Sequence, residues 1–116
     1  LVVFRSKLYA SALYRPAGFF RYEPPDQWIA EPLPDGDKRV ESMAVFGERL
    51  FATSYDNAHV YSFDGKGWVD AGTVGDNTQC YGFAIHHGRL CVSTWPSGKV
   101  YRYNANNDWE DLGRLG

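Results

Sequence analysis

The residues best suited to bind a ligand are three aromatic side chains that recur in equivalent segments of the sequence. Tyr14, Tyr55 and Trp95 each lie five or six residues after a recurring leucine, and polar side chains occupy the same segments. Aromatic faces beside hydrogen-bonding groups suit sugar rings, which present C–H faces and hydroxyl edges. The alternative is that each ring only packs against the next repeat, which its recurrence would also explain. We predict a ligand-binding surface formed by Tyr14, Arg15, Tyr55, Asp56, Asn57, Trp95 and Lys99.

The three histidines do not form a pattern of metal ligands. His59 stands alone, and His86 and His87 are neighbours at an expected turn. A protein metal site needs three or four converging ligands, and no spacing of Cys, His, Asp or Glu here supplies them. We therefore expect no metal, no cofactor and no catalytic residue.

The two cysteines are expected to be free thiols. A hairpin turn at 87–88 places Cys91 opposite Ala84 and Cys80 opposite Trp95. Two cysteines that lie so far apart along paired strands cannot form a disulfide. We predict that both thiols are reduced and buried.

One sequence unit recurs three times along the chain. Each copy contains a leucine after a short polar turn, then an aromatic run, then a tryptophan. Such a period of about 40 residues is typical of β-propeller blades. The anchors of the period are Leu8, Leu50 and Leu90, followed by Trp28, Trp68 and Trp109.

Each unit predicts four short strands and no helix. The first strand ends at Phe4, Phe46 or His86, and the second begins at the leucine after a two-residue turn. The third strand is the aromatic run, and the fourth begins at the tryptophan, which we expect to wedge between blades. The predicted fold class is all-β, a β-propeller with blades at about 1–35, 36–75 and 76–116.

The units resemble the repeats of bacterial propellers grouped as sialidase-like or BNR repeats. The stretch 62–68, SFDGKGW, resembles the Asp-box turn, although it is one residue short and lacks the threonine. This resemblance implies a glycosidase as an alternative function, with three arginines that grip a carboxylate. Several basic residues instead recur with the blade, which favours a role in blade architecture. The recurring positions are Lys7, Arg49 and Arg89, then Arg21 and Arg102; the non-recurring arginines include Arg5, Arg15 and Arg39.

Composition and charge exclude two classes of partner. Twelve basic and 14 acidic residues give a net charge of −2, which argues against nucleic acid or an anionic membrane as a partner. No apolar run approaches the roughly 20 residues of a membrane span. The sequence does not indicate a cellular location.

Three blades are too few to close a ring, because known propellers have roughly four to eight. Leaving two terminal faces of roughly 400 Å² bare would cost on the order of 10 kcal/mol per face. We therefore expect two copies to form a six-bladed homodimer; a larger ring and a piece of a longer propeller are the alternatives. The expected function is binding of a carbohydrate or protein ligand at the loops. The alternatives are a degenerate sialidase-like hydrolase and a purely structural segment.

Overall fold

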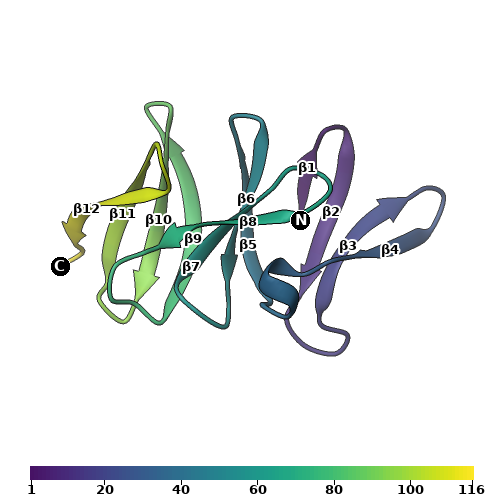
Figure 1. Ribbon diagram of the computed structural model, residues 1–116, viewed down its shortest axis with the longest axis horizontal. Helices are drawn as coiled ribbons and strands as arrows, with labels where there is room; N and C mark the ends of the chain where they lie inside the picture. The colour runs from purple at the N-terminus through teal and green to yellow at the C-terminus, as the bar shows by residue number, and fades with distance from the viewer.

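Twelve strands form three four-stranded antiparallel sheets in the computed structural model, which describes residues 1–116 (Figure 1). The first sheet contains β1 (Val2–Phe4), β2 (Lys7–Ala12), β3 (Gly18–Glu23) and β4 (Gln27–Glu31). The second contains β5 (Val40–Phe46), β6 (Arg49–Ser54), β7 (His59–Phe63) and β8 (Trp68–Thr73). The third contains β9 (Gln79–His86), β10 (Arg89–Trp95), β11 (Lys99–Asn104) and β12 (Asp108–Arg114). A single 3₁₀ turn, η1 (Pro34–Gly36), joins the first two sheets.

The sheets are three consecutive blade-like units, each with its strands paired in sequence order. The predicted first strands end where expected, and both predicted two-residue turns are confirmed: Phe46 pairs with Arg49, and His86 pairs with Arg89. Each second strand begins one residue before its leucine. The arrangement is therefore propeller-like in its all-β blades.

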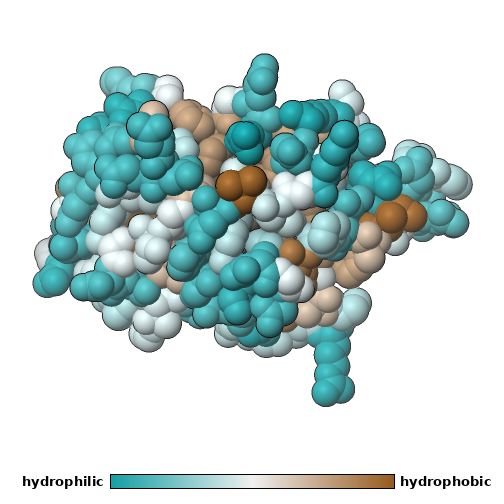
Figure 2. All heavy atoms as spheres, in the orientation of Figure 1, coloured by the Kyte–Doolittle hydropathy of each residue, from teal (hydrophilic) through white to brown (hydrophobic).

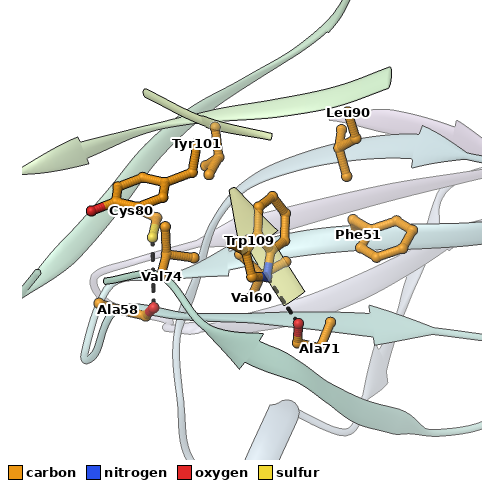
Figure 3. Packing of buried hydrophobic residues seen from close by; sticks show 10 residues of the cluster. Phe51, Ala58, Val60, Ala71, Val74, Cys80, Leu90, Tyr101 and Trp109 are labelled. Atoms are coloured by element: carbon orange, nitrogen blue, oxygen red, sulfur yellow. Dashed lines mark hydrogen bonds between the residues drawn. The ribbon is translucent and has the colours of Figure 1, made fainter. Parts of the chain in front are cut away.

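The middle sheet is apolar on both faces because it packs against a sheet on each side. Along β6, Leu50 and Ala52 lie in a buried cluster with the first sheet, whereas Phe51 lies in a buried cluster with the third. Successive side chains of a strand point to opposite faces, so both alternating sets must be apolar here. Figure 3 shows the second of these clusters, with Phe51 facing the side chains of the third sheet.

The three sheets form a row 45 Å long rather than a closed ring. The first strands of neighbouring sheets, β1, β5 and β9, lie next to one another along this row. The C-terminus lies at the free end of the third sheet (Figure 1). In the view of Figure 2 most of the surface is hydrophilic, with small hydrophobic areas near the middle of the row and near the end formed by the first sheet. One face of the first sheet and one face of the third therefore have no covering sheet.

Two of the three recurring tryptophans act as wedges, and one does not. The indole N–H of Trp68 donates to the carbonyl of Pro32 at 2.7 Å, and that of Trp109 donates to Ala71 at 2.9 Å. Both acceptors belong to the preceding sheet or its end. Trp28 is 46% exposed, so the prediction of a wedge is wrong for this residue in the single chain, because no other sheet of the structure covers its face of the first sheet.

Both cysteines are free, as predicted, but their surroundings differ from the prediction in two ways. Cys91 pairs with Ala84 as expected, whereas Cys80 pairs with Thr94 and not with Trp95, because an irregularity between Val92 and Thr94 shifts the register. Cys80 is buried, and Cys91 is only half-buried since it lies on the uncovered face of the third sheet. Burial raises the pKa of the Cys80 thiol to about 12.

The chain contains no helix that is long and apolar enough to cross a membrane.

Candidate functional site

Two of the predicted aromatic residues meet at the junction between the first and second sheets. Tyr14 follows β2 and Tyr55 follows β6, so the two loops bring equivalent positions of neighbouring sheets together. Their hydroxyl oxygens lie 3.0 Å apart, and the rings meet edge to face with centroids 6.2 Å apart. The pair therefore packs across the junction, as the packing alternative expects, but Tyr14 remains 66% exposed and can also contact a ligand.

Arg39, which precedes β5, holds this pair in place. Its guanidinium carbon lies 4.5 Å from the centroid of Tyr55 and 5.8 Å from that of Tyr14, within the range of cation–π contacts. Its Nη2 donates to Asp56 Oδ1 at 2.7 Å, and its Nε donates to Oδ2 at 3.2 Å, so the ion pair is bidentate. The backbone N–H of Arg39 adds a bond of 2.9 Å to Asp56 Oδ2. We call Tyr14, Arg39, Tyr55 and Asp56 the tyrosine–arginine cluster.

The charges within the tyrosine–arginine cluster compensate each other. Hydrogen bonds from the Arg39 guanidinium lower the pKa of Asp56, and the same contact raises the pKa of Arg39. The hydrogen bond with Tyr14 raises the pKa of Tyr55. The guanidinium of Arg39 and the carboxylate of Asp56 thus cancel each other's charge within the cluster. It presents hydrogen-bonding groups without a net charge.

An open hollow of about 600 Å³ lies beside the cluster. Arg39 also donates through Nη1 to the carbonyl of Leu13 at 3.2 Å, which ties the loop after β2 to the start of β5. Arg15 is exposed and contributes a cationic side chain to the rim of the hollow. The hollow is lined by Leu13, Tyr14, Arg15, Pro16, Ala17 and Arg39. An aromatic face with donors at its edge can hold a flat, hydroxylated ring.

The remaining predicted site residues lie in other contacts. Asn57 stabilises its own loop, since its Oδ1 accepts the N–H of His59 and its Nδ2 donates to the Tyr61 hydroxyl at 3.2 Å. Lys99 pairs with Asp111 of the neighbouring strand at 2.8 Å. The structure therefore brings Tyr14, Arg15, Tyr55 and Asp56 together and leaves Asn57 and Lys99 in local structural roles.

Trp95 follows a different pattern from the two tyrosines. It is 50% exposed at the end of β10, and its backbone carbonyl accepts the N–H of Thr78. At this second junction Gln79 takes the place of Arg39, and its side-chain amide donates to the carbonyl of Tyr55 at 3.1 Å. The tyrosine–arginine cluster therefore exists at one junction only.

Sequence reasoning missed Arg39 because this residue does not recur with the blade. Its position was nevertheless informative, since Arg39 directly precedes a first strand, and the loops before first strands share one rim with the loops after second strands. A non-recurring cation on the same rim as recurring tyrosines is the signal that could have found it.

Groups that could bind a metal or grip a carboxylate are dispersed. No three His, Cys, Asp or Glu side chains lie close enough to hold a metal ion, and His59 instead contacts Asp70 through Nδ1 at 2.8 Å. Arg21 pairs with Glu23 and Glu31 of its own sheet, and Arg102 pairs with Glu110. The recurring arginines thus belong to the blades and not to one anion site.

The turn that resembles an Asp box is built by its aspartate. Asp64 Oδ1 accepts the backbone N–H groups of Lys66 at 2.8 Å and Gly67 at 3.0 Å, and these bonds lower the pKa of Asp64. This is an ordinary use of aspartate in a tight turn. It stabilises the connection between β7 and β8.

No protein-family model matches this chain, and no curated protein matches it in sequence. The propeller-like description consequently rests on the three four-stranded sheets themselves.

Proposed function

We propose that this protein is a ligand-binding module that recognises a neutral carbohydrate at the tyrosine–arginine cluster. The observation that carries the proposal is the exposed Tyr14 ring beside the hollow of about 600 Å³, held in place by Arg39. Sugar rings stack on such aromatic faces, and their hydroxyl groups take up the donors and acceptors at the edge. A protein loop with an exposed apolar side chain is the alternative ligand.

The preference for a neutral sugar follows from charge compensation. Arg39 already has its carboxylate in Asp56, so it cannot offer a full positive charge to a sialic acid. Two of its five N–H groups stay available for hydroxyl oxygens once its bonds to Asp56 and Leu13 are counted. Arg15 is then the one cation at the rim without a carboxylate partner.

We further propose that two chains form a six-bladed ring. The two uncovered sheet faces lie at opposite ends of the row, and each is flanked by exposed apolar side chains such as Val3 and Leu112. Burial of these faces by a second copy would remove them from water. The ring would then contain two copies of the cluster, and a multivalent glycan would bind more strongly than a single sugar.

The test is calorimetric titration of the protein with a panel of neutral mono- and disaccharides. The sugar that binds most tightly is then titrated into variants of the protein. We expect Tyr14→Ala and Tyr55→Ala each to weaken binding by about tenfold or more, because the first removes the exposed aromatic face and the second removes the ring that holds Tyr14 and Arg39 in place. Tyr81→Ala is the matched control, since Tyr81 is 43% exposed but lies outside the cluster. Binding that survives both cluster substitutions would end the proposal, and binding lost in Trp95→Ala alone would place the site at the third sheet.

A sialidase-like activity is tested in parallel with a fluorogenic sialoside. Turnover of this substrate would overturn the proposal of a binding module for neutral sugars. A strong preference for sialic acid over neutral sugars in the titration would contradict the argument from charge compensation.

A further inference from the structure

Trp109 and its acceptor show how one sheet docks on the sheet before it. The indole of Trp109 is 8% exposed and donates to the carbonyl of Ala71 in β8 (Figure 3). Next to this acceptor, Gly72 has a φ of +108°, and a Cβ there would lie 2.4 Å from the carbonyl oxygen of Asn107 and 3.4 Å from Trp109. Only a glycine fits this close approach. We call segment 70–72 the occupied socket.

The occupied socket has a recognisable local structure. Asp70 Oδ1 accepts the N–H of Gly72 at 2.8 Å, and Asp70 pairs with Tyr61 of the neighbouring strand. A register shift follows this pair, so the strand bends where Trp109 approaches it. The aspartate, the bend and the glycine together expose the Ala71 carbonyl to the next sheet.

The same socket occurs at the end of the third sheet, where nothing occupies it. Asp111 Oδ1 accepts the N–H of Gly113 at 2.8 Å, Asp111 pairs with Tyr101, and Gly113 has the same φ of +108°. No atom lies within 4 Å of the position of a Cβ at Gly113. Leu112 takes the place of Ala71 and is 45% exposed. We call segment 111–113 the empty socket.

The first sheet carries a tryptophan without a socket. Trp28 lies 5.1 Å from the Tyr22 ring at an interplanar angle of 54°, and Trp109 lies 5.1 Å from the Tyr103 ring at 55°. Each indole thus packs in a similar way against a tyrosine ring of its own sheet. Trp109 is buried in a socket, whereas Trp28 is 46% exposed on the outer face of the first sheet.

The surfaces around the free tryptophan and the empty socket are both hollowed and apolar. The outer face of the first sheet has a hollow of about 310 Å³ bordered by Ala10, Phe20 and Trp28. The outer face of the third sheet has one of about 310 Å³ that includes Ala84 and Cys91. Small side chains at the centre of a sheet face permit close approach of another sheet.

We propose that Trp28 of one copy of this chain inserts into the empty socket of a second copy, where its indole N–H donates to the carbonyl of Leu112. This inference rests on the proposed assembly of two chains and assigns its contact. A second copy is the occupant that fits. Each chain carries an exposed tryptophan, Trp28, and an empty socket, 111–113, and these match Trp109 and the occupied socket within the chain. Two such contacts, related by a two-fold axis, close the six-bladed ring.

The experiment measures the mass of the 116-residue chain by light scattering over a range of concentrations. We expect twice the 13.1 kDa of one chain, and we expect Trp28→Ala to raise the concentration for half-assembly by at least about tenfold. Val69→Ala is the control, because Val69 is 53% exposed on β8 of the middle sheet, whose two faces are already covered.

A second variant tests the socket. At the occupied socket, the carbonyl of Asn107 lies where a Cβ on Gly72 would be. In Gly113→Ala the added methyl group would block the equivalent space at the empty socket, so we expect loss of assembly with the chain still folded. Gly65→Ala controls for backbone strain, since Gly65 has a similar φ of +102° in the turn between β7 and β8. Circular dichroism confirms folding of each variant.

The outcomes separate this inference from the function proposed above. A dimer that is unchanged in both Trp28→Ala and Gly113→Ala overturns the contact and leaves the ring and the sugar site standing. A chain that stays monomeric at millimolar concentration overturns the contact and the ring together. A larger assembly that depends on Trp28 supports the contact and overturns closure by two chains. Sugar binding is measured separately and does not depend on any of these results.

Discussion

At the scale of single residues, Glu41 is a side chain that lowers the stability of the fold. This side chain is half-buried in β5, and its Oε2 atom has no hydrogen-bond partner. Burial raises the pKa of Glu41, and the charge of Glu41 in turn contributes to the raised pKa of Cys80. A buried carboxylate without a partner favours its neutral form. Glu41 therefore opposes folding once it is ionised.

We predict that Glu41→Gln increases the free energy of unfolding by about 1 kcal/mol at pH 7, because the amide carries no charge. The pKa of Glu41 is higher in the folded chain than its ordinary value of 4.5, so the folded chain holds the proton more strongly. The penalty is absent below the ordinary pKa and grows as pH rises through the raised one. Urea denaturation at pH 4 and pH 7 checks this.

The control for Glu41 is Glu48→Gln, because Glu48 is exposed in the turn between β5 and β6. We expect this variant to match the parent chain at both pH values. The gain in stability of Glu41→Gln over the parent should be larger at pH 7 than at pH 4. An equal gain at both pH values would contradict the role given to the charge of Glu41.

Arg39 illustrates that a sequence can place a residue on the rim without showing which side chains it contacts. The sequence identified Tyr14, Tyr55 and Asp56 because aromatic and polar positions recur with the blade. It could not show that a guanidinium from the preceding connection reaches both rings and the carboxylate. Such a contact depends on the path of two loops, and loop geometry has no periodicity that a sequence pattern can reveal.

At the scale of elements, the fold was more predictable than the site. Two-residue turns fix the register of a hairpin, so the pairs across the turns 47–48 and 87–88 followed from the sequence. The register shifts were not predictable, because an extra residue in a strand has no distinct composition. The shift between Val92 and Thr94 moved the partner of Cys80 by one position. The shifts in β7–β8 and β11–β12 also create the two sockets.

Two tryptophans near the start of β4 and β12, Trp28 and Trp109, give a prediction at this scale. Trp109→Ala should lower the free energy of unfolding by about 3–5 kcal/mol, because it leaves a cavity between two sheets and an unpaired carbonyl at Ala71. Trp28→Ala is the matched control, and in dilute, monomeric protein it should cost less than about 1 kcal/mol, since Trp28 is exposed. Urea denaturation measures both. Equal losses in the two variants would mean that Trp109 is not a wedge.

At the scale of the whole molecule, the two cysteines lie on opposite faces of the third sheet. Cys80 is buried between the second and third sheets, where its Sγ lies 3.7 Å from the carbonyl of Ala58 (Figure 3). Its thiol is protonated at neutral pH, since burial raises its pKa to about 12. Cys91 lies on the uncovered face of the third sheet, in the hollow that a second copy would fill. The fold therefore shields one thiol, and the proposed dimer would shield the other.

This contrast predicts how a water-soluble maleimide modifies the chain at neutral pH. In dilute protein we expect one modified thiol per chain, at Cys91, with Cys80 unmodified until the chain unfolds, because the thiolate is the reactive form. As protein concentration rises, the rate at Cys91 should fall in proportion to the assembled fraction, since in the proposed dimer the partner's first sheet would cover the hollow that Cys91 lines. Mass spectrometry of peptides from timed reactions measures both rates.

In Trp28→Ala the rate at Cys91 should stay fast at every concentration. A rate that does not change while the measured mass doubles would show that the outer face of the third sheet is not the surface that assembles.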